Sequence, residues 1–297
     1  MSLTVLHVGP VESRGGMQAT IHHHLENPPP GWSTEVIGTH VDGSPLSKWF
    51  AWREGRKELV RRLRENPPDL VHVHTATRYS WWRKRRVVDI SLAAGLPVVL
   101  QVHSGDFHHF INRSTLNGKR FRDLCAHPSV TPVALTPAHR DLMALPPDTV
   151  VIGSPSPRLD PVDPDLREPG KLLLLARASP IKGHRLAISA TLMMREEGRD
   201  VNLHLSLEQN HQWVMGLGSE DGIHAHGWMT DVEKRELLRG VGLLLIPSEF
   251  EGMPVVAMEA LSCGLPILAS PACEGILGGG GSIVPHLDAR VWADAIT

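Results

Sequence analysis

The sequence has few cysteines and no hydrophobic run long enough to cross a membrane. Its 297 residues include only Cys125, Cys263 and Cys273, without a CxxC spacing. An odd, scattered set argues against a disulfide framework and fits a reducing compartment. No stretch reaches ~18 apolar residues, and the opening MSLTVLHVGP lacks the basic segment of a signal peptide. We therefore expect a cytoplasmic globular protein.

An excess of charge is also missing. The chain has 30 Lys and Arg against 32 Asp and Glu, a net charge of -2. This balance gives no reason to expect nucleic acid as a partner. The apolar fraction of 41% is ordinary for a globular protein, and the length suits two domains of roughly 150 residues each.

Short apolar runs alternate with helical stretches along the whole chain. Ten of them are expected strands, in two series: Leu3–Val8, Val36–Gly38, Leu70–Val73, Val98–Val102, Val133–Leu135 and Val150–Ile152, then Leu172–Ala176, Val201–Leu205, Leu243–Ile246 and Ile267–Ala269. Such alternation predicts parallel sheets with helices on both faces. Residues 153–170 separate the series and contain five prolines, which predicts a linker. The expected fold is α/β, with Rossmann-like domains at 1–152 and 171–297 facing a cleft.

The strongest functional pattern is the segment Pro247–Pro266, which follows an expected strand. Glu251 lies in the loop after that strand, and Glu259 lies further along the helix that Pro254 begins. Two carboxylates placed in this way can accept hydrogen bonds from hydroxyls of one elongated ligand. The free amides at the helix start suit an anionic or polyhydroxyl group.

Two further patterns suit phosphate. Arg177 and Lys182 follow the first strand of the second series, and fixed cations neutralise a departing diphosphate where no metal does so. Gly15 and Gly16 follow the first strand of the chain and allow a close approach of the backbone to a phosphate.

Together these patterns resemble retaining GT-B glycosyltransferases with the E-x7-E signature (group 1, family 4 type). The resemblance implies that Glu251, Gly252, Met253 and Pro254 line the site of the donor hexose, and that Glu259 holds the ribose. It assigns the remaining donor contacts to the following residues: Arg177 and Lys182 at the diphosphate, Gly15 and Gly16 at the same group, and His103 near the reacting carbon.

The implied activity is a retaining, metal-independent hexosyl transfer. A hexosyl or N-acetylhexosaminyl group would pass from a nucleotide-sugar, for which we expect a UDP-sugar, to an acceptor hydroxyl. The resemblance places the reaction in surface-polysaccharide, glycolipid or secondary-metabolite biosynthesis, with a sugar, lipid-linked or metabolite acceptor. No cofactor or metal is expected. The chain ends at Thr297, so its C-terminal region is shorter than the resemblance implies.

The 18 histidines leave open a different class of function, a metal-dependent hydrolase, as a lesser alternative. Its ligands would come from His72, His74, His103 and Asp106. The adjacent residues 22–24 face different directions on a helix and cannot chelate one ion together. A third alternative is a partner protein that binds a nucleotide-sugar without turning it over.

Two basic aromatic stretches leave a membrane contact open. Lys48–Glu65 carries seven basic and three acidic residues, and Arg78–Arg86 carries five basic residues among three aromatics. Either suits an anionic acceptor or the inner face of the membrane. The favoured interpretation is a helix packed on the sheet with its arginines in water.

Overall fold

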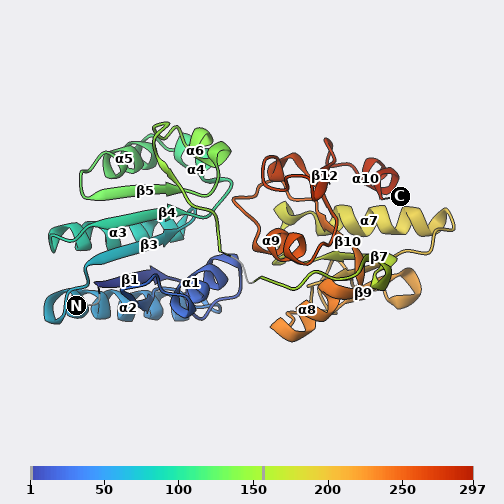
Figure 1. Cartoon of the computed structure of the whole chain (residues 1–297), viewed down its shortest axis with the longest axis horizontal. Coiled ribbons are helices and arrows are strands. Elements are labelled where there is room, and N and C mark those ends of the chain that lie inside the picture. The colour runs from blue at the N-terminus through green and yellow to red at the C-terminus, as the bar shows by residue number, and fades with distance from the viewer. Residues whose placement is uncertain (1–2, 156–157, 297) are drawn as a thin grey trace. The chain divides into compact units, whose positions relative to one another are not determined.

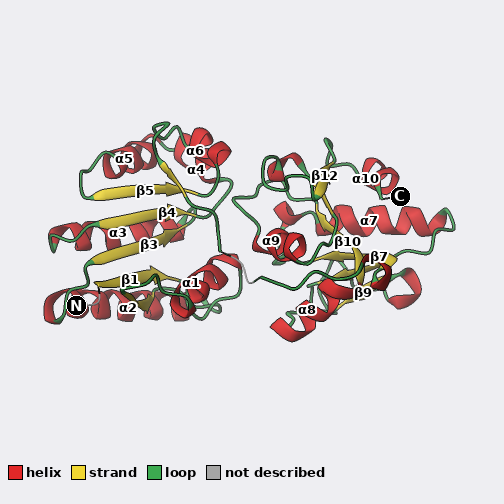
Figure 2. Cartoon of the chain, viewed as in Figure 1, coloured by secondary structure: helices red, strands yellow, loops and turns green. Residues whose placement is uncertain are grey.

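The computed structural model describes residues 3–155 and 158–296. The chain divides into two compact units, Met1–Ser156 and Pro157–Thr297 (Figure 1). Ser156 and Pro157, which fall in the predicted linker, lie outside the described residues. Each unit is an α/β layered structure around one parallel sheet (Figure 2).

The first unit contains a six-stranded parallel sheet of order β2-β1-β3-β4-β5-β6. Its strands are β1 Leu3–Gly9, β2 Trp32–Gly38, β3 Leu70–Thr75, β4 Val98–Val102, β5 Val130–Ala134 and β6 Val150–Val151. Its helices are α1 Gly16–Glu26, α2 Pro45–Glu65, α3 Tyr79–Ala93, α4 Phe107–Asn112, α5 Thr115–Cys125 and α6 Pro137–Leu142. The strand order reverses between β1 and β3, and ligands of such sheets bind at the carboxyl ends of the strands near this point.

Burial explains why the two basic stretches form helices on this sheet. In α2, Trp52, Leu59 and Leu63 point into the core, and in α3, Trp81 and Val87 do so. The apolar residues recur at helical spacing, and the arginines between those of α2 are mostly exposed. In α3, however, Lys84 is buried and Arg83 and Arg85 are half-buried, so packing with all arginines in water describes α2 better than α3.

The second unit contains a parallel sheet of order β12-β11-β10-β7-β8-β9. Its strands are β7 Glu168–Leu174, β8 Asn202–Leu205, β9 Ile223–Ala225, β10 Val241–Ile246, β11 Ile267–Ala269 and β12 Gly281–Ile283. Its α-helices are α7 His184–Glu196, α8 Asp231–Gly240, α9 Val255–Ser262 and α10 Ala289–Ala295. All ten expected strands are present, and β9 and β12 were missed.

Part of the segment predicted as a linker packs on the second unit. The buried Arg167 donates hydrogen bonds to the carbonyls of Leu238 at 2.8 Å, Val241 at 3.1 Å and Cys263 at 2.7 Å. The amide of Leu159 donates to Oγ of Ser262. The strand β7 begins at Glu168, so the structure differs here from a free linker over residues 153–170. Prolines alone do not reveal this, because the contacts come from distant residues.

None of the helices in the described part of the chain is both long and apolar enough to span a membrane.

Candidate active site

Glu251 lies where β10 ends and the chain turns toward α9. Its side chain is 9% exposed, and its Oε1 accepts two hydrogen bonds, from Oγ of Ser248 at 2.7 Å and from Nζ of Lys182 at 2.6 Å. Lys182 comes from a different loop, after β7. The resemblance assigns Glu251 to the hexose of the donor and Lys182 to the diphosphate. In the structure the two side chains form an ion pair with each other.

Close contact between the two loops makes this pairing possible. The amide of Glu249 donates a hydrogen bond to the carbonyl of Ile181 at 2.8 Å. Gly183 follows Lys182 with a φ of 72°, and a Cβ added there would lie 2.1 Å from the carbonyl oxygen of Pro247. Only glycine allows both this conformation and this approach. The Lys-Gly pair thus positions the Lys182 ammonium against Glu251.

We expect Gly183→Ala to lower thermal stability strongly and to reduce activity, because the new methyl group must separate the two loops. Gly198→Ala is the matched control. Its φ of 81° is similar, but nothing lies within 4 Å of its added Cβ. The strain of a positive φ alone costs on the order of 1 kcal/mol, so the difference between the two variants isolates the clash. Equal decreases of the urea unfolding midpoint in Gly183→Ala and Gly198→Ala would contradict this explanation.

Glu259 is held in a second ion pair. It lies on α9, is 3% exposed, and its Oε1 accepts from Nζ of Lys234 on α8 at 2.7 Å. Lys234 also contacts Asp231 at 3.1 Å. Burial opposes the charge of Lys234, but the two carboxylates outweigh it and raise its pKa. Sequence reasoning missed Lys234. The capping box formed by Thr230 and Glu233 predicts where α8 begins, but it does not predict that Lys234 of α8 contacts α9.

The remaining residues expected at the donor lie around these pairs. Arg177 is exposed just beyond β7, and its guanidinium forms no hydrogen bond or ion pair with any other described residue. Gly252 is buried, and Met253 and Pro254 lead into the first turn of α9, where Pro254 occupies the cap position. In that turn the amide of Ala257 donates to the carbonyl of Pro254 at 3.0 Å, and helix geometry leaves the amides of Val255 and Val256 without an internal acceptor.

In the first unit, Gly15 and His103 lie at the carboxyl edge of the sheet. Gly15 caps α1 with a φ of 139°, which suits glycine, and Gly16 is the first residue of that helix. His103 follows β4, and its Nε2 lies 3.0 Å from Nδ1 of His74. His74 Nε2 lies 3.0 Å from Nδ1 of His7. Three imidazoles from neighbouring strands thus form a hydrogen-bonded chain that ends at His103, whose Nδ1 is left for other contacts.

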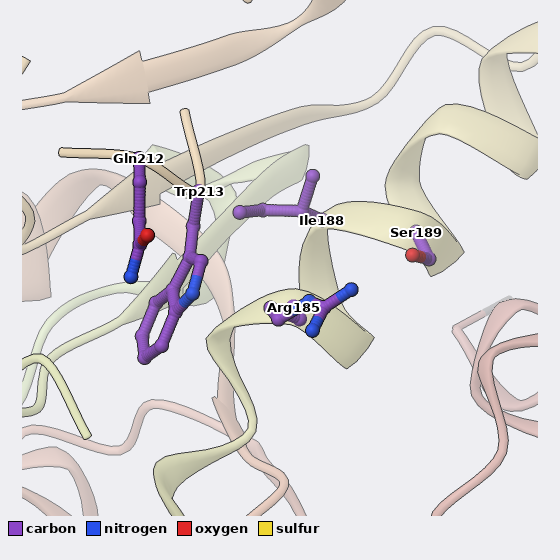
Figure 3. A pocket seen from close by; sticks show the side chains of 5 residues that line it. All are labelled: Arg185, Ile188, Ser189, Gln212 and Trp213. Carbon is purple, nitrogen blue, oxygen red and sulfur yellow. The ribbon is translucent and has the colours of Figure 1, made fainter. Parts of the chain in front are cut away.

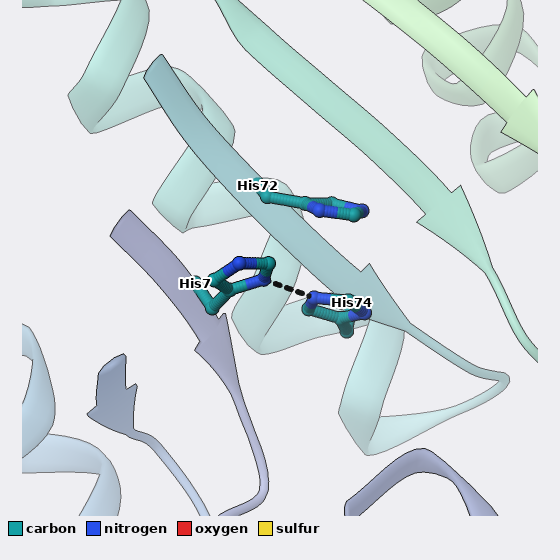
Figure 4. Close-up of side chains that lie close together, drawn as sticks. All are labelled: His7, His72 and His74. Atoms are coloured by element: carbon teal, nitrogen blue, oxygen red, sulfur yellow. Dashed lines mark hydrogen bonds between the residues drawn. The ribbon is translucent and has the colours of Figure 1, made fainter. Parts of the chain in front are cut away.

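His72 joins this cluster on the same face of the sheet (Figure 4). One ring nitrogen from each of His7, His72 and His74 lies within 4.8 Å of the others, so this set is able to hold a metal ion. The set predicted for a hydrolase differs from it. Asp106 is not a member and accepts a hydrogen bond from Oγ of Ser104 instead. No carboxylate joins the three imidazoles in the cluster found among the described residues.

These histidines are held neutral by burial. It lowers the pKa of His7 to about 4 and that of His103 to about 3, with smaller effects of neighbouring histidines. His139, which contacts the carbonyl of Ser104, has a pKa lowered to about 4, again mainly by burial. A neutral imidazole donates one hydrogen bond and accepts another, as the chain requires.

We expect acid to unfold the protein because of these lowered pKa values. The unfolded chain binds protons below a pKa of ~6.5 while the native histidines do not, so stability is full above that pH and falls as the pH drops toward ~4. Urea unfolding midpoints measured between about pH 7.5 and 5 give the slope of stability against pH. His139→Gln should flatten it, whereas the exposed His127→Gln should not. A pH-independent midpoint would refute the buried neutral cluster.

A separate open pocket of about 450 Å³ lies on the second unit. Figure 3 shows Arg185, Ile188 and Ser189 of α7 on one side of it and Gln212 and Trp213 on the other. None of the residues predicted to bind the donor lines it.

Residues 169–297 match the family model described as glycosyl transferases group 1. The second unit belongs to the group 1 glycosyl transferases. Its membership agrees with the resemblance carried by Glu251, Glu259, Arg177 and Lys182, whereas the role of each of these residues stays a prediction.

Three curated proteins are similar to parts of this chain. The MMP alpha-(1->4)-mannosyltransferase of Mycolicibacterium hassiacum is 35% identical over 34% of this chain and 26% of its own length. The mannosylfructose-phosphate synthase of Agrobacterium fabrum is 27% identical over 34% of this chain and 25% of its own. The amylovoran biosynthesis glycosyltransferase AmsK of Erwinia amylovora is 28% identical over 35% and 28%. The matched region spans about a quarter of each relative.

Solved structures show the fold of the whole chain. The sucrose-phosphate synthase of Thermosynechococcus elongatus aligns over 99% of this chain and 88% of its own, with a TM-score of 0.67 and 16% identity. WaaG, a glycosyltransferase involved in lipopolysaccharide biosynthesis, aligns over 99% and 89%, with a TM-score of 0.65 and 15% identity. Both support a GT-B fold built from two Rossmann-like sheets, which confirms the predicted fold class.

Proposed function

We propose that this protein is a retaining, metal-independent hexosyltransferase that moves a sugar from a nucleotide-sugar to an acceptor hydroxyl. The observation that carries the proposal is the buried Ser248–Glu251–Lys182 arrangement at the carboxyl end of β10, within a unit of the group 1 family. A carboxylate and an ammonium held together at this edge provide both an acceptor for sugar hydroxyls and a cation for the leaving diphosphate.

The donor is proposed to extend along the second unit. Glu251 and the amides of Gly252 and Met253 would contact the hexose, with Pro254 lining the same site, and Glu259 would accept hydrogen bonds from the ribose hydroxyls. Arg177 would meet the diphosphate, because its guanidinium has no competing partner among the described side chains. Gly15 and Gly16 of the first unit are proposed to approach the same diphosphate.

The chemistry follows from the charges. As the glycosidic bond breaks, negative charge grows on the diphosphate, and Arg177 and Lys182 would neutralise it. Glu251 is proposed to bind the sugar and not to attack it, with Oε1 held in place by Ser248 and Lys182. The phosphate oxygen of the donor would instead take the proton of the acceptor hydroxyl. His103, neutral and oriented by His74, would position the sugar through its Nδ1.

The donor nucleotide and acceptor are also proposals. Two relatives are named for mannosyl transfer and one for amylovoran biosynthesis, which supports a hexosyl group and an acceptor in surface-polysaccharide or related biosynthesis. We keep a UDP-sugar as the expected donor. The cytoplasm suits the buried free thiols of Cys263 and Cys273. Contact of α2 or α3 with the inner membrane face stays a prediction.

The test is turnover of a panel of UDP- and GDP-hexoses, followed as release of the nucleoside diphosphate, with and without EDTA. We expect one donor to be hydrolysed slowly or transferred, and EDTA to leave the rate unchanged. Metal analysis of the protein addresses His7, His72 and His74 directly. Activity that EDTA abolishes and a divalent ion restores would favour the metal-dependent alternative. Donor binding without any turnover would favour a non-catalytic partner.

A further inference from the structure

Four histidine side chains of the first unit lie close together on one face of its sheet. His7 of β1 and His72 of β3 are register partners, and His74 lies two residues further along β3, so the three share a face. His24 of α1 stacks on His7, with ring centroids 5.2 Å apart. One ring nitrogen each of His7, His72 and His74 lies within 4.8 Å of the others (Figure 4). Imidazoles from three separate elements therefore meet at one point of the fold.

The position of the proton on His72 is set by its neighbour Gln101. The amide nitrogen of Gln101 donates to the carbonyl of Ile152 at 3.2 Å, which turns its Oε1 toward His72. Because Oε1 accepts hydrogen bonds and cannot donate them, Nε2 of His72, 3.1 Å away, carries the proton. Nδ1 of His72 therefore holds a lone pair, and no described residue donates a hydrogen bond to it.

His74 also has a fixed partner on the side that faces away from His7. Its Nε2 lies 3.0 Å from Nδ1 of His7, and its Nδ1 lies 3.0 Å from Nε2 of His103. A histidine that binds a metal through one ring nitrogen usually donates the N–H of the other to a fixed acceptor, which orients the ring. Gln101 is placed to accept from His72 in this way, and His103 is placed to accept from His74.

The distances between the rings suit a single ion. With a bond of ~2.0–2.1 Å from each nitrogen to zinc, imidazole rings on one tetrahedral ion have centroids roughly 5 Å apart. The ring of His7 lies 4.9 Å from that of His72 and 5.3 Å from that of His74. The ring of His24 lies 5.8 Å from His72 and 6.2 Å from His74. The rings of His72 and His74 are closer, at 4.1 Å, and they separate by rotation about their Cβ–Cγ bonds, a torsion with broad minima.

We propose that this group of four histidines binds a divalent ion of the zinc class, which joins β1, β3 and α1. Its ligands are His7, His24, His72 and His74. A shared proton explains the contact between His7 and His74 but leaves Nδ1 of His72 without a donor, whereas an ion uses a lone pair of every ring. Imidazole ligands suit Zn²⁺, while Mg²⁺ and Ca²⁺ take oxygen ligands, and no carboxylate belongs to the group among the described residues.

The role of this ion is structural. The ligands close around it when β1 pairs with β3, so the ion is bound as the chain folds and needs no channel from solvent. None of the residues assigned to the sugar donor is a ligand. The sequence predicts no metal for the reaction, and this ion has no part in it.

The first experiment measures the ion that the full chain holds after folding. The protein, prepared without a polyhistidine tag, is unfolded in urea with EDTA, transferred to metal-free urea and refolded with excess Zn²⁺. Dialysis against a weak chelator then removes zinc from exposed histidines. We expect elemental analysis to find about one Zn²⁺ per chain. A wild-type protein that retains no zinc would overturn the proposal.

Two variants remove one ligand nitrogen each and keep the neighbouring hydrogen bond. In His72→Gln an amide replaces Nε2 and still reaches Gln101, but Nδ1 is lost. In His7→Asn an amide replaces Nδ1 and still faces His74. We expect each variant to bind Zn²⁺ at least about tenfold more weakly than the wild type. His139→Gln is the matched control, since His139 lies outside the group and is 3% exposed, as His7 is. Zinc affinity equal to that of the wild type in both ligand variants would overturn the assignment.

The second experiment tests the coordination without any need for sugar transfer. Co²⁺ takes the place of Zn²⁺ in nitrogen sites, and its visible absorption reports the ligands. We expect His24→Gln to change this spectrum and His23→Gln to leave it unchanged, because adjacent residues of α1 face different directions. An identical spectrum in His24→Gln would remove His24 from the site.

Thermal stability provides a further measurement on the same samples. Zn²⁺ supplied during refolding should raise the Tm of the wild type and of His139→Gln, because an ion that binds the folded state stabilises it. It should not raise the Tm of His72→Gln. An equal rise in all three proteins would refute a site that includes His72.

Discussion

Replacing Lys182 by alanine is expected to slow sugar transfer on the order of 10²–10³-fold. The variant removes the ammonium proposed to face the departing diphosphate, and among the described residues it leaves the carboxylate of Glu251 with a hydrogen bond from Ser248 alone. The loss should appear in kcat, because the charge it neutralises grows as the bond breaks. Initial rates under saturating donor measure it. Lys171→Ala is the control, since Lys171 forms an ion pair of the same 2.6 Å with Glu168 on β7.

Arg177→Ala should also lower kcat. Unlike Lys182→Ala, it should leave the hydrogen bonds of Glu251 intact. If Lys182 and Glu251 act as one unit, the effects of Lys182→Ala and Glu251→Gln on kcat should not add in the double variant. Near-wild-type rates in both Arg177→Ala and Lys182→Ala would end the assignment of these cations to the diphosphate.

The sequence predicted every strand of the first sheet and the four central strands of the second, and it missed the two edge strands of the second sheet. Apolar runs such as Leu70–Val73 are visible because parallel strands are covered by helices. The strands Ile223–Ala225 and Gly281–Ile283 have three residues each and lie at the two edges of their sheet. Their pairing depends on strands that are distant in the sequence, so no local sequence pattern predicts them.

The candidate site was predictable where local motifs define it. The positions of Glu251 and Lys182 follow from strand ends, but their 2.6 Å contact depends on the approach of Gly183 to Pro247. Lys84 belongs to a stretch whose composition suggests an arginine-rich surface, but it is 1% exposed and donates a hydrogen bond to Thr39, which is distant in the sequence. The spacing of apolar residues predicts which face of a helix is buried. It does not predict that a lysine such as Lys84 is buried without a carboxylate partner among the described residues.

Substitutions of Glu251 and Glu259, the two glutamates of the E-x7-E pattern, should change different kinetic parameters. Glu251→Gln is expected to lower kcat as well as donor affinity, because hydrogen bonds to the hexose strengthen as the ring flattens. Glu259→Gln is expected mainly to raise the donor KM, since the ribose is remote from the reacting carbon. Binding of the free nucleoside diphosphate separates them further. It should weaken by about 1–3 kcal/mol in Glu259→Gln and change little in Glu251→Gln.

Glutamine is preferred to alanine at residue 259 because the site is 3% exposed and a cavity would add a cost of its own. Lys234 loses an ionic partner in Glu259→Gln but keeps Asp231 at 3.1 Å. Lys234→Gln is therefore the control for the broken ion pair, since it keeps the carboxylate and should weaken nucleotide binding less. Calorimetric titration of the nucleotide measures all three variants. Loss of nucleotide binding in Glu251→Gln with retention in Glu259→Gln would reverse the proposed direction of the donor along the second unit.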